Sequence, residues 1–319
     1  MIEKSGEICY KVTDKQKIRE LNMKTAARTR VVTLLLIIAV VAGAALLLIS
    51  RLEPEEADPH AGQVYINDGF GMVWMTPLEG VPVNVITAEE ITNVNGQIDY
   101  NGEKYTTLRG VDVSEHQWDI DWSKVAASGV DFAMIRACYR GYTEGGLFTD
   151  PYFKKNIEGA LANGLQVGVY VFSQAISVQE AMEEADYILA LIEGYNVTMP
   201  VVFDWEKIED NDLARTKDLD SEILNDCAVA FCEKVRLAGK VPAIYFNRHL
   251  GYYRYDLSRL TDYMFWLSVP GRYPEFYYAA DMWQYSFTEQ VPGIDEPVDM
   301  NLLFIPVPEP EADAGTPAS

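Results

Sequence analysis

The longest pattern in the chain is an unbroken apolar run, VVTLLLIIAVVAGAALLLI, from Val31 to Ile49. As a helix it spans about 28 Å, close to the thickness of a bilayer's hydrocarbon core. A long segment precedes it and no small-x-small cleavage site follows, so an uncleaved membrane anchor is favoured over a signal peptide. Basic residues before the run and acidic residues after it predict a cytoplasmic N-terminus and an extracellular remainder. These flanking residues are Lys24, Arg28, Arg30, Glu53, Glu55 and Glu56.

From Arg109 onward, short apolar runs alternate with longer amphipathic segments. This alternation predicts an α/β fold, a TIM-like (β/α) barrel with fewer helices in its last part. The helices are expected within 150–164, 177–195 and 221–239, with N-caps at Ser177 and Ser221 and stops at Gly164 and Gly239. The eight expected strands are GVDVS, FAMIRACY, QVGVYVFS, PVVFDWE, VPAIYFN, MFWLSVP, DMWQYS and VDMNLLF.

The segment between the anchor and the barrel has short β-branched and aromatic runs, and Asn-Gly pairs at 95–96 and 101–102 predict hairpin turns. We expect a small β-rich stalk there. Its alternative role is to dock an envelope protein through an exposed apolar patch of Phe70, Trp74 and Met75.

The pattern divides the chain into six expected parts. They are a cytoplasmic basic segment (1–30), a transmembrane helix (31–50), an acidic linker (51–63), the stalk (64–107), the barrel (108–305) and a disordered, acidic, Pro-rich tail (306–319).

Composition excludes several classes of protein. The formal charge is −22, and because residues 1–30 carry +4, the rest of the chain carries −26. We expect no binding to nucleic acid, because that requires a basic surface and this part of the chain is strongly acidic. No two of the three His (His60, His116 and His249) have a metal-ligand spacing, so we expect no metal and no cofactor. Four Cys at irregular positions read as ordinary thiols: Cys9, Cys138, Cys227 and Cys232.

Acidic residues mark the ends of three expected strands. Asp204 and Glu206 end PVVFDWE, and as positions i and i+2 of a strand they point to one face with α-carbons about 6.7 Å apart. Asp112 ends the first strand and Asp299 opens the last, and barrel closure makes those two strands neighbours. Glycoside hydrolysis requires two carboxyl groups, one protonated and one charged. The alternative for each residue alone is a turn former or a solvated loop.

Several motifs in register resemble glycoside hydrolase family 25, the muramidases of the bacterial and fungal lysozyme type. They are GVDVSEHQ with IDW, FAMIRACYRG, GLQVGVYVFSQA, PVVFDWE, and WQYS with VPGIDEPVDMN, across about residues 108–304. The resemblance implies a barrel that cuts the β-1,4 bond between N-acetylmuramic acid and N-acetylglucosamine. It also implies Glu206 as the acid, Asp204 as its charged partner, and Asp112 and Asp299 as further active-site carboxylates.

Aromatic residues near strand ends are candidates for binding sugar rings, although core packing is the commoner role for each. His116 is expected to form loop hydrogen bonds. Trp118 stands where many family members have Gly, so the shape of that rim is open. The candidate aromatic residues are Tyr139, Tyr170, Trp205, Tyr245, Trp283 and Tyr285.

The sequence therefore predicts a membrane-anchored enzyme whose partner is the glycan strand of peptidoglycan, which it remodels or turns over. Two alternatives stay open: an inactive glycan-binding scaffold in an envelope complex, and a hydrolase of another amino-sugar polymer. The sequence leaves the stereochemistry open, because the 2-acetamido group of the substrate can itself attack the anomeric carbon.

Overall fold

The computed structural model describes residues 4–50, 58–94, 97–209 and 211–308 and divides the chain into two compact units, Met1–Ala61 and Gly62–Ser319. In the first unit, α1 (Lys4–Ser50) contains the expected apolar run. The segment Lys15–Leu48 is long enough to cross a membrane and contains an 18-residue stretch with a mean hydropathy of 3.0. The Asn95–Gly96 turn and most of the expected linker and tail lie outside the described residues.

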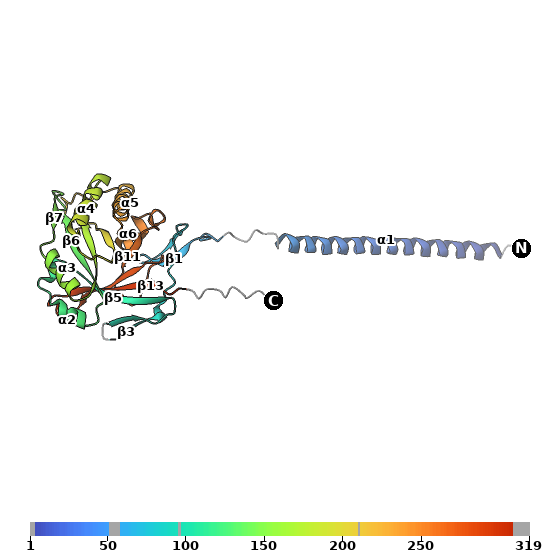
Figure 1. Ribbon diagram of the computed structural model, residues 1–319. Coiled ribbons are helices and arrows are strands. Elements are labelled where there is room, and N and C mark those ends of the chain that lie inside the picture. The colour runs from blue at the N-terminus through green and yellow to red at the C-terminus, as the bar shows by residue number, and fades with distance from the viewer. Residues whose placement is uncertain (1–3, 51–57, 95–96, 210, 309–319) are drawn as a thin grey trace, which may run out of the picture. The chain divides into compact units, whose positions relative to one another are not determined.

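The second unit is an eight-stranded mixed barrel (Figure 1). Seven strands run parallel, while the last lies antiparallel between β12 and β5. The pairing of β5 with β6 closes the barrel. Short β7 (Leu147–Thr149) adds to β6 outside the ring. The barrel strands are β5 (Tyr105–Val113), β6 (Phe132–Arg140), β8 (Gln166–Ser173), β9 (Val201–Trp205), β10 (Pro242–Asn247), β11 (Met264–Ser268), β12 (Met282–Glu289) and β13 (Val298–Pro306). All eight expected strands are present.

Helices cover the outside of the barrel between successive early strands. They are α2 (Trp122–Ala127), α3 (Phe153–Ala162), α4 (Val178–Leu191), α5 (Ser221–Leu237) and α6 (Arg248–Tyr253). The Ser177 hydroxyl caps α4 as expected, by accepting from the amide of Glu180. The expected cap of α5 is wrong, because Asp220 accepts from the amide of Glu222 and Ser221 is already helical. Gly164 and Gly239 follow their helices with positive φ, as expected of stops.

Strand residues alternate between two apolar layers, one inside the barrel and one beneath the helices. In β9, Val202 belongs to the inner layer, while Phe203 and Trp205 belong to the outer one. The ring of Phe203 packs 5.4 Å from that of Phe231 on α5. This alternation directs Asp204, between Phe203 and Trp205, to the inside. Three of the Cys are free and buried, as expected of ordinary thiols: Cys138, Cys227 and Cys232.

The segment before the barrel holds two antiparallel hairpins, β1 (Val64–Asn67) with β2 (Met72–Met75) and β3 (Ile91–Val94) with β4 (Gln97–Tyr100). The turn expected at 101–102 is no hairpin, because the strands on its two sides are not paired with each other.

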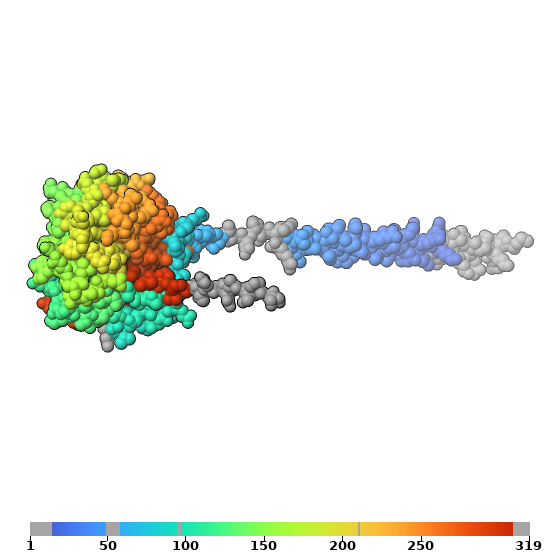
Figure 2. Space-filling model, in the orientation of Figure 1, coloured from blue at the N-terminus to red at the C-terminus, as the bar shows by residue number. Residues whose placement is uncertain are grey.

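This segment covers the barrel where no helix links β11 to β12. The side chain of Asn84 donates to the carbonyls of Pro274 and Phe276 in that loop. Val81 and Ile86 join the outer apolar layer. In space-filling view the cyan surface of this segment lies against the orange surface of the C-terminal part of the chain (Figure 2). The expected stalk is thus packed into the barrel's own unit.

Candidate active site

A pocket of about 310 Å³ opens where the parallel strands of the barrel end. The four expected carboxylates line it together. Asp204 lies near the end of β9 and Glu206 directly follows that strand, while Asp112 on β5 lies opposite Asp299 on β13 in the antiparallel register. The remaining lining residues are Ser114, His116, Gln117, Arg136, Tyr170, Phe172, Tyr245, Trp266 and Gln284.

Two buried amides hold the carboxylates of β5 and β13. The side-chain nitrogen of Gln284 donates to Oδ2 of Asp112 and to Oδ2 of Asp299, at 3.0 Å each. Asn301 donates to the same Asp112 oxygen at 2.7 Å. The hydroxyl of Tyr245 donates to the Gln284 oxygen at 2.8 Å, which fixes the orientation of that amide. These bonds tie together strands that meet only because the barrel closes.

The backbone carrying Glu206 is held by a third buried amide. Gln174, after β8, donates from Nε2 to the carbonyl of Glu206 at 2.8 Å. Its oxygen accepts from the hydroxyl of Thr216 at 2.7 Å. Glu206 itself stays half-buried, so its carboxyl group faces the pocket on a fixed backbone.

Arg136 is the single cation among the residues that line this pocket. Its Nε donates to Asp150 at 2.8 Å and its Nη2 to Glu115 at 2.9 Å. Neither acceptor lines the pocket, so the arginine is already paired with carboxylates outside it. The pocket therefore holds four carboxyl groups and one cation, and that cation is already bound to the carboxylates of Asp150 and Glu115.

Burial raises the pKa of all four carboxyl groups. The pKa of Asp112 rises to about 6, because hydrogen bonds from Asn301 and Gln284 only partly offset the effect of burial. The pKa of Asp299 rises to about 8, since the charges of Asp112 and Glu206 add to burial. The site consequently retains protons at neutral pH.

The pKa values of Asp204 and Glu206, at the end of β9, are also raised. Burial, and then the charge of Asp112, raise the pKa of Glu206. Burial and the charges of Glu206 and Asp112 raise the pKa of Asp204 well above its usual range, and Arg136 opposes them. The Oδ1 atom of Asp204 is buried and has no hydrogen-bond partner among the described residues. An unpartnered buried oxygen in a pocket is a natural contact for an N–H group of a ligand.

The sequence model described as "Glycosyl hydrolases family 25" matches residues 111–294, more than half of the chain. The chain belongs to this family.

Relatives of the chain carry different descriptions. "Uncharacterized protein YegX" of Escherichia coli (strain K12) is 31% identical over 214 residues, covering 65% of this chain and 73% of the relative. "Lysozyme M1" of Streptomyces globisporus is 28% identical over 212 residues, covering 61% and 67%. The autolysin LytC of Streptococcus pneumoniae, solved "in complex with synthetic peptidoglycan ligand", superposes with a TM-score of 0.54 at 22% identity, covering 76% of this chain and 56% of LytC. The similarity to LytC supports the fold alone.

Two of the expected sugar-binding aromatic residues line the family 25 pocket, Tyr170 and Tyr245. Phe172 and Trp266 line it as well and were not expected. The ring of Trp266 lies 4.9 Å from that of Tyr245, and its indole N–H donates to Asn301. Trp266 is therefore part of the same hydrogen-bonded assembly as Asp112.

The other four expected aromatic residues do not line the pocket. Trp205, Trp283 and Tyr285 belong to the buried outer layer, because their positions alternate away from the barrel interior. The guanidinium of Arg254 lies 5.5 Å from the Trp205 ring, and the Trp283 indole donates to the carbonyl of Val269. Tyr139 stacks on Phe148 of β7. Substrate binding by these four residues stays a prediction.

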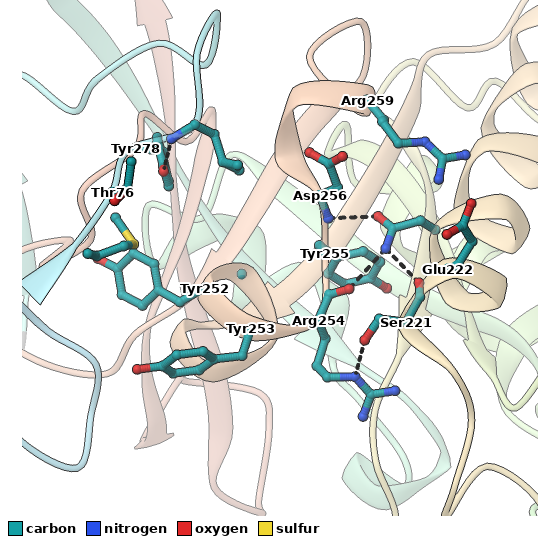
Figure 3. A pocket seen from close by; sticks show the side chains of 14 residues that line it. Thr76, Ser221, Glu222, Tyr252, Tyr253, Arg254, Tyr255, Asp256, Arg259 and Tyr278 are labelled. Carbon is teal, nitrogen blue, oxygen red and sulfur yellow. Dashed lines mark hydrogen bonds between the residues drawn. The ribbon is translucent and has the colours of Figure 1, made fainter. Parts of the chain in front are cut away.

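A second cavity, of about 360 Å³, lies between the end of β2, α6 and the start of α5 (Figure 3). Many of its polar groups already have internal partners. The hydroxyls of Tyr252 and Tyr278 accept from backbone amides, and Arg254 donates to Ser221 and to the carbonyl of Leu219. None of the four family 25 carboxylates lines it.

Proposed function

We propose that this chain is a muramidase that hydrolyses the β-1,4 bond between N-acetylmuramic acid and N-acetylglucosamine in peptidoglycan. The observation that carries the proposal is the convergence of four carboxyl groups, with raised pKa values, in one aromatic-lined pocket of a family 25 barrel. Aromatic rings pack on the apolar faces of sugars, and a retained proton supplies the acid.

Glu206 is the proposed general acid. It is half-buried, so it is open to the pocket, while burial raises its pKa and favours the protonated form that must donate. It gives its proton to the glycosidic oxygen as the bond from that oxygen to the anomeric carbon breaks. It then takes a proton from the water that attacks this carbon, which restores the acid.

Asp204 is proposed to support the 2-acetamido group of the substrate. Its unpartnered Oδ1 is suited to accept from the acetamido N–H, and that bond would favour the charged form of Asp204. The acetamido carbonyl oxygen then attacks the anomeric carbon, and the negative charge stabilises the oxazolinium intermediate. Asp112 and Asp299 complete the set of carboxyl groups that line the pocket. The first product keeps its anomeric configuration, and an inverted anomer observed by NMR would contradict this step.

We also propose that α1 is an uncleaved anchor with the barrel outside the cell. This topology is supported by the apolar run from Val31 to Ile49, which lies in a helix long enough to cross a membrane, and by the basic residues before Val31. Cleavage would then occur at the inner face of the wall, during remodelling or turnover. Protease added to intact cells stripped of their wall should remove the barrel and spare the N-terminus, and a barrel found free in the medium would contradict the anchor.

The test is product analysis with the full-length chain in detergent, acting on purified peptidoglycan. We expect new reducing ends at N-acetylmuramic acid, and none with Glu206→Gln. If the wild type binds the glycan and releases nothing, the chain is a scaffold and the proposal fails. Cleavage of a chitin-like polymer in place of peptidoglycan would keep the hydrolase and overturn the substrate.

A further inference from the structure

Trp118 has a backbone conformation that rarely suits a side chain. Within the described ranges it is the one residue other than glycine with a positive φ, at φ 51° and ψ −129°. Such geometry destabilises any residue with a β-carbon, and bulky residues most of all. It persists only where the surrounding structure fixes it, and such strain concentrates at functional sites.

Burial of the indole does not offset this strain. The side chain is 61% exposed, and its ring contact is edge-to-face with Tyr152 at 6.1 Å. A large apolar group that stays in solvent adds little to folding. Neither the backbone nor the packing therefore explains a tryptophan at this position.

The residues before Trp118 place it at the rim of the active site. His116 and Gln117 line the pocket, and the α-carbon of Trp118 lies about 3.8 Å from that of Gln117. Ser114 and Gln117 form a reciprocal cap, in which the Ser114 hydroxyl accepts from the amide of His116 and the Gln117 oxygen from the amide of Ser114.

The same loop is fixed to the pocket wall from below. Asp150 accepts from the amide of Glu115 at 3.0 Å and from Arg136, which lines the pocket. The amide of Tyr152 donates to the other Asp150 oxygen at 2.9 Å. One buried carboxylate thus holds the pocket cation, the loop that carries the indole and the aromatic ring beside it.

We propose that Trp118 is a sugar-binding platform at the rim, on which a saccharide of the glycan strand packs beyond the residues being cleaved. This inference rests on the proposed function for the identity of the glycan. An exposed flat ring held on a rigid loop loses little freedom when a sugar stacks on it. The strained backbone at Trp118 is then retained because the indole binds glycan. A glycine at this position would make the fold more stable but would bind glycan less tightly.

The test measures affinity and stability together, in full-length chains that carry Glu206→Gln so that no glycan is cut. The probe is soluble peptidoglycan glycan strands freed of their peptides. Trp118→Gly removes ring and strain, Trp118→Ala removes the ring alone, and Phe70→Ala is a control that removes another exposed ring, on the β1–β2 hairpin. We expect Trp118→Gly and Trp118→Ala each to weaken binding about tenfold, the effect of losing one good aromatic contact.

Unfolding in urea separates the two Trp118 variants. The midpoint should rise for Trp118→Gly and should not rise for Trp118→Ala, while Phe70→Ala should leave affinity unchanged. Equal affinity of both Trp118 variants and the parent would overturn the platform. Because binding is measured without cleavage, a wild type that binds but does not hydrolyse would end the muramidase proposal and leave this one standing.

Discussion

Strand β6 carries two buried arginines, Arg136 and Arg140, and each serves a different cluster of acidic groups. Arg140 donates to Glu184 at 2.6 Å and to two backbone carbonyls, while Ser173 donates to the other Glu184 oxygen at 2.6 Å. This cluster has one buried anion for one buried cation. The candidate active-site pocket has four carboxyl groups, and the cation among its lining residues, Arg136, is paired with carboxylates outside the pocket.

This difference in charge balance distinguishes the Arg140–Glu184 cluster, which stabilises the fold, from the pocket carboxyl groups, which we propose take part in the chemistry. Burial raises the pKa of Glu184 to about 7, opposed by bonds from Ser173 and Arg140. In the pocket the pKa of Asp299 rises further, to about 8, because neighbouring carboxylates add to burial. Burial alone therefore does not mark a functional carboxylate. An excess of like charge that the fold leaves unneutralised does.

Breaking the balanced cluster should have the largest effect on stability. Glu184→Gln leaves Arg140 with no buried anion, and we expect it to lower the free energy of unfolding by about 3–5 kcal/mol. Urea unfolding at pH 8, where Glu184 is charged, measures this loss. Glu183→Gln is the matched control, since Glu183 is on the same helix, 3.6 Å from the same arginine, but half-exposed. Equal losses for the two variants would contradict the contrast.

Removing one charge from the pocket carboxyl groups should have the opposite effect and raise the free energy of unfolding. The pKa of Asp299 is about 8 in the fold against an ordinary value of 3.8, so the folded chain binds more protons between these pH values. Its contribution to stability therefore falls as pH rises through this window. Asp299→Asn keeps an acceptor for Gln284 and should be more stable than wild type at pH 8, on the order of 1 kcal/mol.

The difference between Asp299→Asn and the wild type should vanish near pH 4, where Asp299 is protonated in the fold. Thermal unfolding across pH 4–9 checks the slope. A variant that follows the wild-type curve in parallel would show that Asp299 is not part of a strained charge cluster.

Breaking an exposed ion pair should have the smallest effect on stability. Arg259 and Asp226 form an ion pair with both side chains more than a third exposed. Solvent screens such pairs, so Asp226→Asn should change the free energy of unfolding by less than about 0.5 kcal/mol. A loss near that of Glu184→Gln in the same urea measurement would mean that burial does not govern these interactions.

The sequence was sufficient to predict the barrel strands and the meeting of four carboxylates, because both follow from apolar runs with acidic ends. It did not predict the faces of β12. Both faces of a barrel strand are buried, so Trp283 and Gln284 are each compatible with either layer. Only the closed barrel shows that Gln284 points inward.

Two further features depend on contacts between distant segments. Trp266 lines the pocket from a strand that begins with four apolar residues in a row, and no local signal distinguishes it from its neighbours Phe265 and Leu267. The packing of residues 78–91 over the loop before β12 depends on side-chain bonds such as those from Asn84. Trp205 differs from these, because it alternates with Asp204 and Glu206 along one strand, and that period of two is enough to place it on the opposite face.

The most direct test of the contrast is the rate at which reducing ends are released from purified peptidoglycan, per folded molecule, by wild type, Glu206→Gln and Glu184→Gln. The account predicts that Glu206→Gln loses the rate by roughly 10²–10⁴-fold, the usual contribution of a general acid. It also predicts that folded Glu184→Gln keeps the wild-type rate. Hydrolysis by Glu206→Gln at the wild-type rate, or an equal loss in both variants, would contradict it.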